Sequence, residues 1–231
     1  MKIALQYCGL PRWTKAVVES QFNKLMIPAD AQLDVFCAFW RVDNVDYGKL
    51  SQEASAIFGK PPVVMHVIDG YMPAVPANVL RFAEVRPENV YKMYRAIAYV
   101  NQVRADYARQ QGLAYDIVIR SRTDIMLDRP LPLTKLVGVA QHCIVLPSNG
   151  HWRGGLNDQF AIAKPSDMDY YSGTHDNLDT YLATGAPLHP EQMLRRHLEA
   201  GGISSVFGDF STELYREPVL EPLSTGTPQA F

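Results

Sequence analysis

Cysteine is scarce in this sequence, and no hydrophobic run is long enough to cross a bilayer. The three cysteines among 231 residues are odd in number, lie far apart and form no Cys-x-x-Cys pair, which argues against a disulfide framework and a cysteine zinc site. Each stands within an apolar run and is expected to be buried, in a protein of the reducing cytoplasm. We expect a soluble cytoplasmic chain with no transmembrane segment, compatible with peripheral association with a membrane.

The sequence also lacks an excess of charge of either sign. Its 22 basic and 24 acidic side chains leave a net charge of −2, so no overall field draws the protein to nucleic acid, which is not expected as a partner. Hydrophobic residues make up 47% of the chain and charged residues 20%, which excludes disorder as the main state. Any anionic ligand must therefore be held by a local site.

Short apolar runs alternate with helical patterns along the chain. The runs are typical of strands and stand at 3–7, 33–39, 63–68, 116–119, 143–146 and 159–163. Apolar residues recur at steps of three and four over 90–107, and further helix starts are expected at 166–169 and 189–191. The alternation predicts the α/β class: one domain with a mainly parallel, mixed sheet flanked by helices. An extended C-terminal tail is expected over 218–231, which is rich in Pro, Ser, Thr and Gly.

The first candidate site is Gly9-Leu10-Pro11-Arg12, between the first strand and a helix. Ligands of open α/β sheets bind at the carboxyl ends of strands, where Gly9 would let the backbone approach a phosphate and Arg12 would bind its oxygens. An ordinary strand-to-helix turn uses the same residue types. The motifs Gly-x-Gly-x-x-Gly and Gly-x-x-x-x-Gly-Lys-Ser/Thr are absent, which disfavours dehydrogenases, P-loop enzymes and α/β methyltransferases.

The second candidate is the strand at 116–119, which runs into Arg120, Arg122 and Asp124. Charged groups at the end of a buried strand are costly to desolvate unless they meet a ligand or each other. If the strand geometry continues, the three share one face and the two residues between them point away, which suits a bound pyrophosphate. The alternative is an internal ion-pair network, in which Arg120 and Arg122 would pair with Asp116, Asp124 or Asp128.

Two later segments are candidates for catalysis and acceptor binding. A glycine-rich loop behind Trp152 brings Asn157 and Asp158 to the start of a strand, although a hairpin turn uses the same residue types. His189 and Glu191 stand at a helix start, where Glu191 would act in catalysis or simply complement the helix dipole. The histidines show no metal-ligand spacing, which does not support a zinc enzyme.

Taken together, these stretches resemble a family of bacterial and viral glycosyltransferases with a GT-A-like fold, which includes enzymes of lipopolysaccharide and capsule synthesis. The shared order comprises a Gly-x-x-Arg turn, a long Tyr-bearing helix, a Tyr-Asp-x-Val-Ile-Arg-x-Arg-x-Asp strand, an Asn-Asp-Gln-Phe loop and a late Pro-Glu. These stand here at 9–12, 91–107, 115–124, 157–160 and 190–191. The resemblance covers most of the chain.

The resemblance implies an enzyme of polysaccharide biosynthesis that transfers a sugar from a nucleotide-sugar donor to a glycan or glycolipid acceptor. It puts Asp124 in the place of the Asp-x-Asp carboxylate that holds Mn²⁺ or Mg²⁺, although Arg122 replaces the first aspartate and can take over part of the cation's work. The implied roles are donor binding by Gly9, Arg12, Arg120, Arg122 and Asp124, acceptor contacts by Trp152, Asn157 and His189, and catalysis by Asp158 or Glu191. The rival hypothesis is a non-catalytic nucleotide- or sugar-binding module.

Overall fold

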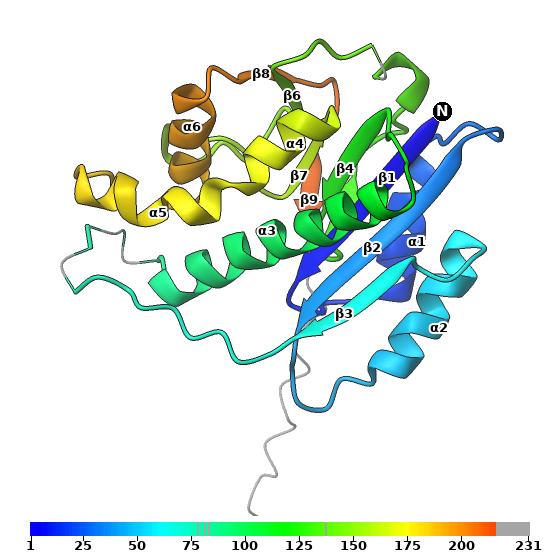
Figure 1. The fold of residues 1–231 in the computed structure, drawn as a ribbon, viewed down its shortest axis with the longest axis horizontal. Helices are drawn as coiled ribbons and strands as arrows, with labels where there is room; N and C mark the ends of the chain where they lie inside the picture. Colours follow the sequence, from blue (N-terminus) through cyan, green and yellow to red (C-terminus); the bar gives the residue numbers. More distant parts are fainter. Residues whose placement is uncertain (78, 81, 83, 137, 216–231) are drawn as a thin grey trace, which may run out of the picture.

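A mixed sheet of seven strands, in the order β3-β2-β1-β4-β7-β6-β8, forms the centre of the computed structural model, which describes residues 1–215 except 78, 81, 83 and 137 (Figure 1). The strands are β1 (Lys2–Gly9), β2 (Gln32–Trp40), β3 (Val64–Ile68), β4 (Ile117–Ser121), β5 (Ile125–Leu127), β6 (Cys143–Leu146), β7 (Phe160–Ala163), β8 (Ser204–Phe207) and β9 (Thr212–Leu214). The helices are α1 (Lys15–Lys24), α2 (Tyr47–Phe58), α3 (Pro87–Gln110), α4 (Pro165–Ser172), α5 (Thr174–Ala183) and α6 (Pro190–Ala200), with short 3₁₀ turns at Leu133–Lys135 and Trp152–Gly154.

The strand pairing is mainly parallel. β1 pairs in parallel with both β2 and β4, and β2–β3 and β6–β8 are also parallel, whereas β7 runs antiparallel to β4 and β6. A separate two-stranded ribbon joins β5 to β9. The expected α/β class, a single domain with a mainly parallel, mixed sheet, is therefore confirmed.

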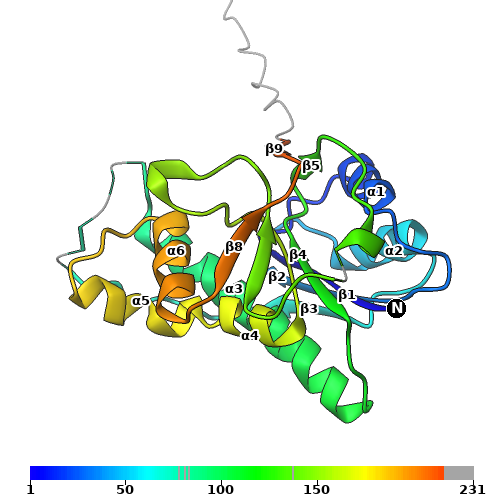
Figure 2. The same ribbon diagram turned by 90° about the horizontal axis from the view of Figure 1, so that it is seen from above.

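Helices cover both faces of this sheet because its central strands are apolar on both faces. In β1, Ile3, Leu5 and Tyr7 belong to one buried cluster and Ala4 and Cys8 to the other, as the two-residue period of a strand requires. Helices α1 and α2 lie on the first side, and α3 to α6 lie on the second, as the two views together show (Figures 1 and 2). The long helix α3 packs across β1 and β2 and brings its first turns to the carboxyl ends of the strands.

Some elements depart from the sequence expectations. The strand expected at 116–119 is shifted to Ile117–Ser121 and ends there, so Arg122 and Asp124 lie in a turn rather than on a continuing strand. The pattern did not predict α2, α5, β5, β8 and β9. The tail expected at 218–231 lies outside the described residues.

Two other expectations concern the cysteines and the bilayer. All three cysteines are free and buried, as their apolar surroundings predict. Among the residues whose placement is described, no helix is both long enough and apolar enough to cross a membrane.

Candidate functional site

A pocket of about 530 Å³ lies where the carboxyl ends of β1 and β4 meet. The order of the sheet changes direction between these strands, which is the usual place for a ligand in an open α/β sheet. The turn after β1, the turn after β4, the first turns of α3 and the start of α6 form its walls. The chain turns at Gly9, whose φ is +109°. Glycine is favoured there because it has no Cβ and reaches positive φ without strain.

The pocket wall carries more basic than acidic side chains. The basic ones are Arg12, Arg86, Lys92, Arg120 and Arg122, and the acidic ones are Glu84, Asp124 and Glu191. With a net charge of only −2 on the whole chain, this excess is local. The volume falls in the range of ordinary small-molecule sites, and the charge suits an anionic ligand.

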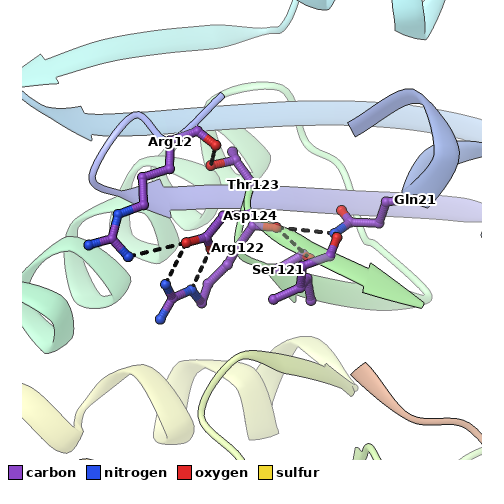
Figure 3. Close-up of polar contacts among 7 residues, drawn as sticks. Arg12, Gln21, Ser121, Arg122, Thr123 and Asp124 are labelled. Carbon is purple, nitrogen blue, oxygen red and sulfur yellow. Dashed lines mark hydrogen bonds and ion pairs between the residues drawn. The ribbon is translucent and has the colours of Figure 1, made fainter. Parts of the chain in front are cut away.

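Two arginines converge on the Asp124 carboxylate (Figure 3). Arg122 binds it in a bidentate fashion, with Nε 2.7 Å from Oδ1 and Nη2 2.7 Å from Oδ2. Arg12 donates from Nη1 to Oδ2 at 3.2 Å from the other side. The carboxylate is almost fully buried, while the Arg12 and Arg122 side chains are 47% and 23% exposed. Asp124 thus holds two guanidinium groups in the pocket wall, with nitrogens left over for a ligand. We call these three side chains the arginine clamp.

The turn that carries the clamp is itself held from α1. The buried amide of Gln21 donates to the carbonyl oxygens of Arg122 and Ile125, both at 3.1 Å, and accepts from the Tyr7 hydroxyl at 2.7 Å. Thr123 donates from its hydroxyl to the Arg12 carbonyl. Thr123 also lines the pocket, which corrects the expectation that it points away from the arginines. These bonds fix both arms of the clamp before any ligand binds.

The clamp sets the charge of Asp124. Burial raises the pKa of this carboxyl, but the hydrogen bonds and charges of Arg122 and Arg12 outweigh it and leave the pKa below its ordinary value. Asp124 is therefore ionised at neutral pH. The alternative of an internal ion-pair network is thus present in part, because Asp124 pairs with Arg122, and Arg12 joins the pair in place of Arg120.

Arg120 takes a different position from Arg122. It belongs to β4, opposite Gln6 of β1, and its side chain is almost fully buried between the sheet and α4 while still lining the pocket. Its Nε and Nη1 find no hydrogen-bond partner among the described residues. Burial lowers the pKa of Arg120, but the nearby Tyr171, Cys8 and Asp158 outweigh burial and leave the pKa above its ordinary value. Arg120 therefore stays charged. A buried guanidinium with unused donors in a pocket wall is costly without an anion nearby.

At the start of α6, His189 and Glu191 form the opposite wall of the pocket. Their Nδ1 and Oε2 atoms are 2.9 Å apart, and both side chains are less than a tenth exposed. Burial, and then the charge of Asp158, raise the pKa of Glu191 to about 8, so this carboxyl is protonated at neutral pH. Burial also lowers the pKa of His189.

The glycine-rich loop packs against this same helix start. The backbone N–H of Leu156 donates to the Glu191 carbonyl at 2.9 Å, and a Cβ added to Gly155 would overlap the Glu191 backbone and lie 2.5 Å from its Cβ. The glycine at 155 is thus required by a close approach of two backbones. The loop positions Glu191 rather than reaching over the pocket.

We expect Gly155→Ala to destabilise the protein by about 1–3 kcal/mol, because α6 must move away from the loop. Thermal unfolding measures this as a drop of about 2–4 °C per kcal/mol. Gly138→Ala is the matched control, since a Cβ there meets nothing within 4 Å and its φ is not positive. Equal melting temperatures for the two variants would contradict the close packing.

Seven of the ten residues expected at the site line this one pocket. They are Gly9, Arg12, Arg120, Arg122, Asp124, His189 and Glu191.

The other three expected residues lie outside the pocket. Trp152 is exposed, and its acceptor role stays a prediction. Asn157 is fully buried and its amide donates to the Asn149 carbonyl and the Thr212 hydroxyl, which corrects the expectation that it contacts an acceptor. Asp158 is buried and does not line the pocket; it supplies negative charge near Arg120 and Glu191.

Sequence reasoning missed two parts of the site. One is the start of α3, where Arg86 and Lys92 add positive charge to the pocket. A signal for it was present, because Arg86 directly precedes the Pro-Glu that begins a helix. The other is Gln21, an ordinary polar residue of an amphipathic helix, for which the sequence offers no signal.

A divalent metal, implied by the family resemblance through Asp124, does not suit this donor set. Three guanidinium N–H groups already bind the two Asp124 oxygens. Within the described ranges no group of three or more His, Cys, Asp or Glu side chains is arranged to hold an ion. Two arginines beside one carboxylate repel a cation and occupy the oxygens it would need. The metal role expected for Asp124 is therefore corrected to the holding of Arg12 and Arg122.

No protein-family model and no curated protein sequence matches the chain. Solved glycosyltransferase structures align with most of the chain at low sequence identity. GlyE of Streptococcus pneumoniae TIGR4 aligns with 88% of this chain at 10% identity and a TM-score of 0.47. The galactosyltransferase LgtC, solved with donor and acceptor sugar analogues, aligns with 89% at 11% identity and the same TM-score. The aligned part is 44% of GlyE and 73% of LgtC, so the chain spans less than half of GlyE.

Proposed function

We propose that this protein is a glycosyltransferase that binds the diphosphate of a nucleotide-sugar donor on the arginine clamp. The observation that carries the proposal is the convergence of Arg12 and Arg122 on a buried carboxylate at the carboxyl ends of β1 and β4. Guanidinium groups fixed in this way present planar pairs of N–H donors, which match the oxygens of a pyrophosphate. Loss of a nucleoside diphosphate also needs positive charge at the departing oxygen, and the clamp supplies it.

Two further features support a sugar donor over a simple phosphate site. Arg120 adds a third guanidinium to the same wall, where it is almost fully buried and stays charged. His189 and Glu191 lie across the pocket and offer a carboxyl–imidazole pair for the proton that an acceptor hydroxyl must lose during transfer. A pocket of about 530 Å³ can hold a nucleotide with part of its sugar.

A finer proposal follows from the sequence resemblance. In this proposal the protein is a cytoplasmic enzyme of polysaccharide biosynthesis, and its acceptor is a glycan or a glycolipid. An acceptor carried by a lipid would place the protein at a membrane surface without a spanning helix. The exposed Trp152, on the 3₁₀ turn that leads to the glycine-rich loop, remains the candidate for stacking on an acceptor sugar.

We expect a nucleoside diphosphate to bind without any divalent cation. Isothermal calorimetry with UDP, GDP, CDP and TDP, each in EDTA and again with Mn²⁺, measures this directly. The clamp predicts at least one binder in EDTA, with an affinity changed less than about threefold by the metal. Because screening weakens charge contacts of half-exposed arginines, affinity should also fall with added salt. No heat from any nucleotide would contradict the proposal. Binding that occurs only with Mn²⁺ would show that the site needs a metal after all.

Donor turnover separates the enzyme from the rival non-catalytic module. Incubation of the protein with nucleotide sugars of the same four nucleotides should release nucleoside diphosphate slowly, because the sugar is transferred to water. A module that only binds would keep nucleotide affinity and leave every donor intact. Intact donors after long incubation, with nucleotide binding preserved, would favour the module.

A further inference from the structure

The start of α3 presents three hydrogen-bond donors to the pocket. Arg86, Asn89 and Lys92 follow one another at steps of three residues, which places them on one side of the helix. All three line the pocket, whereas Glu88, the acidic residue of the first turn, lines only a neighbouring, smaller pocket. We call Arg86, Asn89 and Lys92 the donor stripe.

The donor stripe has no partner of its own in the described part of the chain. None of its three side chains makes a hydrogen bond or an ion pair with another described residue. The carboxylate of Glu84, which also lines the pocket, is bound by Arg153, with Nη2 2.7 Å from Oε1. The charges of Arg86 and Lys92 therefore stay uncompensated in the pocket wall.

The place of these two cations is electrostatically unfavourable for the fold. Arg86 is the N-cap of α3, a helix of 24 residues, and Lys92 follows in its second turn. The N-terminal end of a helix carries the positive pole of its dipole, which favours acidic side chains and disfavours cations. The arginine clamp adds more positive charge to the same pocket. A bound anion would relieve this repulsion.

The diphosphate of a nucleotide sugar does not need the donor stripe for neutralisation. It carries one negative charge on each phosphate. The guanidinium groups of Arg12, Arg120 and Arg122 line the pocket after β1 and β4. The carboxylate set against them there is that of Asp124, which is bound by Arg12 and Arg122. This side of the pocket therefore balances a diphosphate, and the cations of α3 remain for another group.

We propose that the donor stripe is a second anion subsite, which binds a carboxylate or phosphate group carried by the transferred sugar or by the acceptor. The proposal rests on the proposed function, because it takes the donor diphosphate to occupy the arginine clamp. Guanidinium, carboxamide and ammonium groups all donate hydrogen bonds, and a carboxylate or phosphate offers several acceptor oxygens to them. The site would then prefer an anionic substrate over its neutral counterpart, which leaves the donors unpaired.

The first test asks whether the donor carries the second anion. Its probe is the nucleoside triphosphate of the tightest binder among UDP, GDP, CDP and TDP, because the third phosphate extends beyond the diphosphate as the sugar does. In calorimetry in EDTA at low ionic strength, the wild type should bind the triphosphate at least about tenfold more tightly than the diphosphate. The double variant Arg86→Gln/Lys92→Gln should lose this preference, while its affinity for the diphosphate changes less than about threefold.

Arg109→Gln is the matched control for this experiment. It removes an arginine that is 72% exposed at the far end of the same helix. This variant should keep the wild-type preference for the triphosphate. An equal loss of preference in Arg109→Gln and in the double variant would overturn the subsite, because overall charge would then explain the effect.

The second test asks whether the acceptor carries the anion. The protein, saturated with the nucleoside diphosphate, is titrated with D-glucuronate, with glucose 6-phosphate and with neutral D-glucose. Binding of either anionic sugar that is lost in Arg86→Gln/Lys92→Gln would place the anion on the acceptor. A triphosphate preference without such binding would place it on the donor. If the stripe contributes to neither, the proposal is overturned while the arginine clamp stands.

Stability separates a ligand role of the donor stripe from a structural one. Neither Arg86 nor Lys92 is buried, so the double variant should fold. Its melting temperature should be unchanged or raised by up to about 4 °C, because two cations leave the positive end of the helix dipole. A lower melting temperature with unchanged anion binding would overturn the proposal, because the cations would then serve the fold. If no nucleotide binds, the proposed function fails, and titration of the ligand-free protein with the same anionic sugars still decides the subsite.

Discussion

Asp124→Asn is expected to reduce donor turnover by about a hundredfold or more while lowering the melting temperature by only a few degrees. The amide presents an NH₂ group to guanidinium donors and carries no charge, so the three contacts from Arg12 and Arg122 cannot all form. Both arginines are partly exposed and can turn to water when released. The fold therefore loses little, whereas the anion site loses the positions of both its arms.

Nucleotide affinity measured in EDTA on the same preparation distinguishes positioning from metal binding. The clamp predicts an affinity at least tenfold weaker for Asp124→Asn in EDTA. A metal ligand predicts no change in EDTA and a loss confined to samples with Mn²⁺. Asp209→Asn is the control, because it removes the same charge from a side chain that is 97% exposed. A variant that unfolds would mean that Asp124 serves the fold first.

The pH dependence of stability gives a further check on this carboxylate. Because its neighbours hold the pKa of Asp124 below its ordinary value, ionised Asp124 stabilises the wild type at neutral pH. That contribution is fully present above the pKa that Asp124 has in the unfolded chain. It is lost as pH falls through the lower pKa that Asp124 has in the folded protein. The gap in melting temperature between the wild type and Asp124→Asn should therefore narrow on acidification. An unchanged gap would show that the clamp contributes nothing through charge.

The strands of the sheet could be predicted from sequence where they are buried on both faces. Such strands are continuous apolar runs, and the run at 143–146 coincides with β6. β8 lies at the edge, and its Val206 and Phe207 are half-exposed, so Ser204–Phe207 gives no comparable run. Helix α2 did carry signals: Asp46 caps its first turn through the Lys49 N–H, and Gly59 ends it with a φ of +70°.

The candidate site was predictable to the extent that it follows from strand order. Residues that end neighbouring parallel strands must meet at one edge of the sheet, which brings the turn with Arg12 to the turn with Arg122 and Asp124. The contacts that fix these turns were not predictable. Gln21 binds a carbonyl 101 residues away, and nothing local marks that partner. Asn157 was misassigned because a turn residue whose amide is satisfied internally has the same sequence signature as one that faces a ligand.

Glu191→Gln is expected to bind the nucleotide normally at pH 7 and to lose about a hundredfold or more in transfer, the scale of general acid–base catalysis. The amide keeps the size and hydrogen bonding of the neutral acid but can neither take nor give a carboxyl proton. Glu191 starts protonated at neutral pH, so it must first lose its own proton before it can take the proton of the acceptor. As pH rises, turnover of bound donor should then increase because more of Glu191 is carboxylate, and the increase should be centred above pH 8 because the negative charge of bound donor raises the pKa of Glu191 above its value of about 8 in the free protein; donor affinity should fall over the same range. Steady-state kinetics from pH 7 to 9 separate turnover from affinity: kcat should rise with pH, and 1/KM for the donor should fall. Glu199→Gln, which removes an exposed carboxylate from the same helix, should show both trends, and undiminished transfer by Glu191→Gln would place the acceptor's proton on another group.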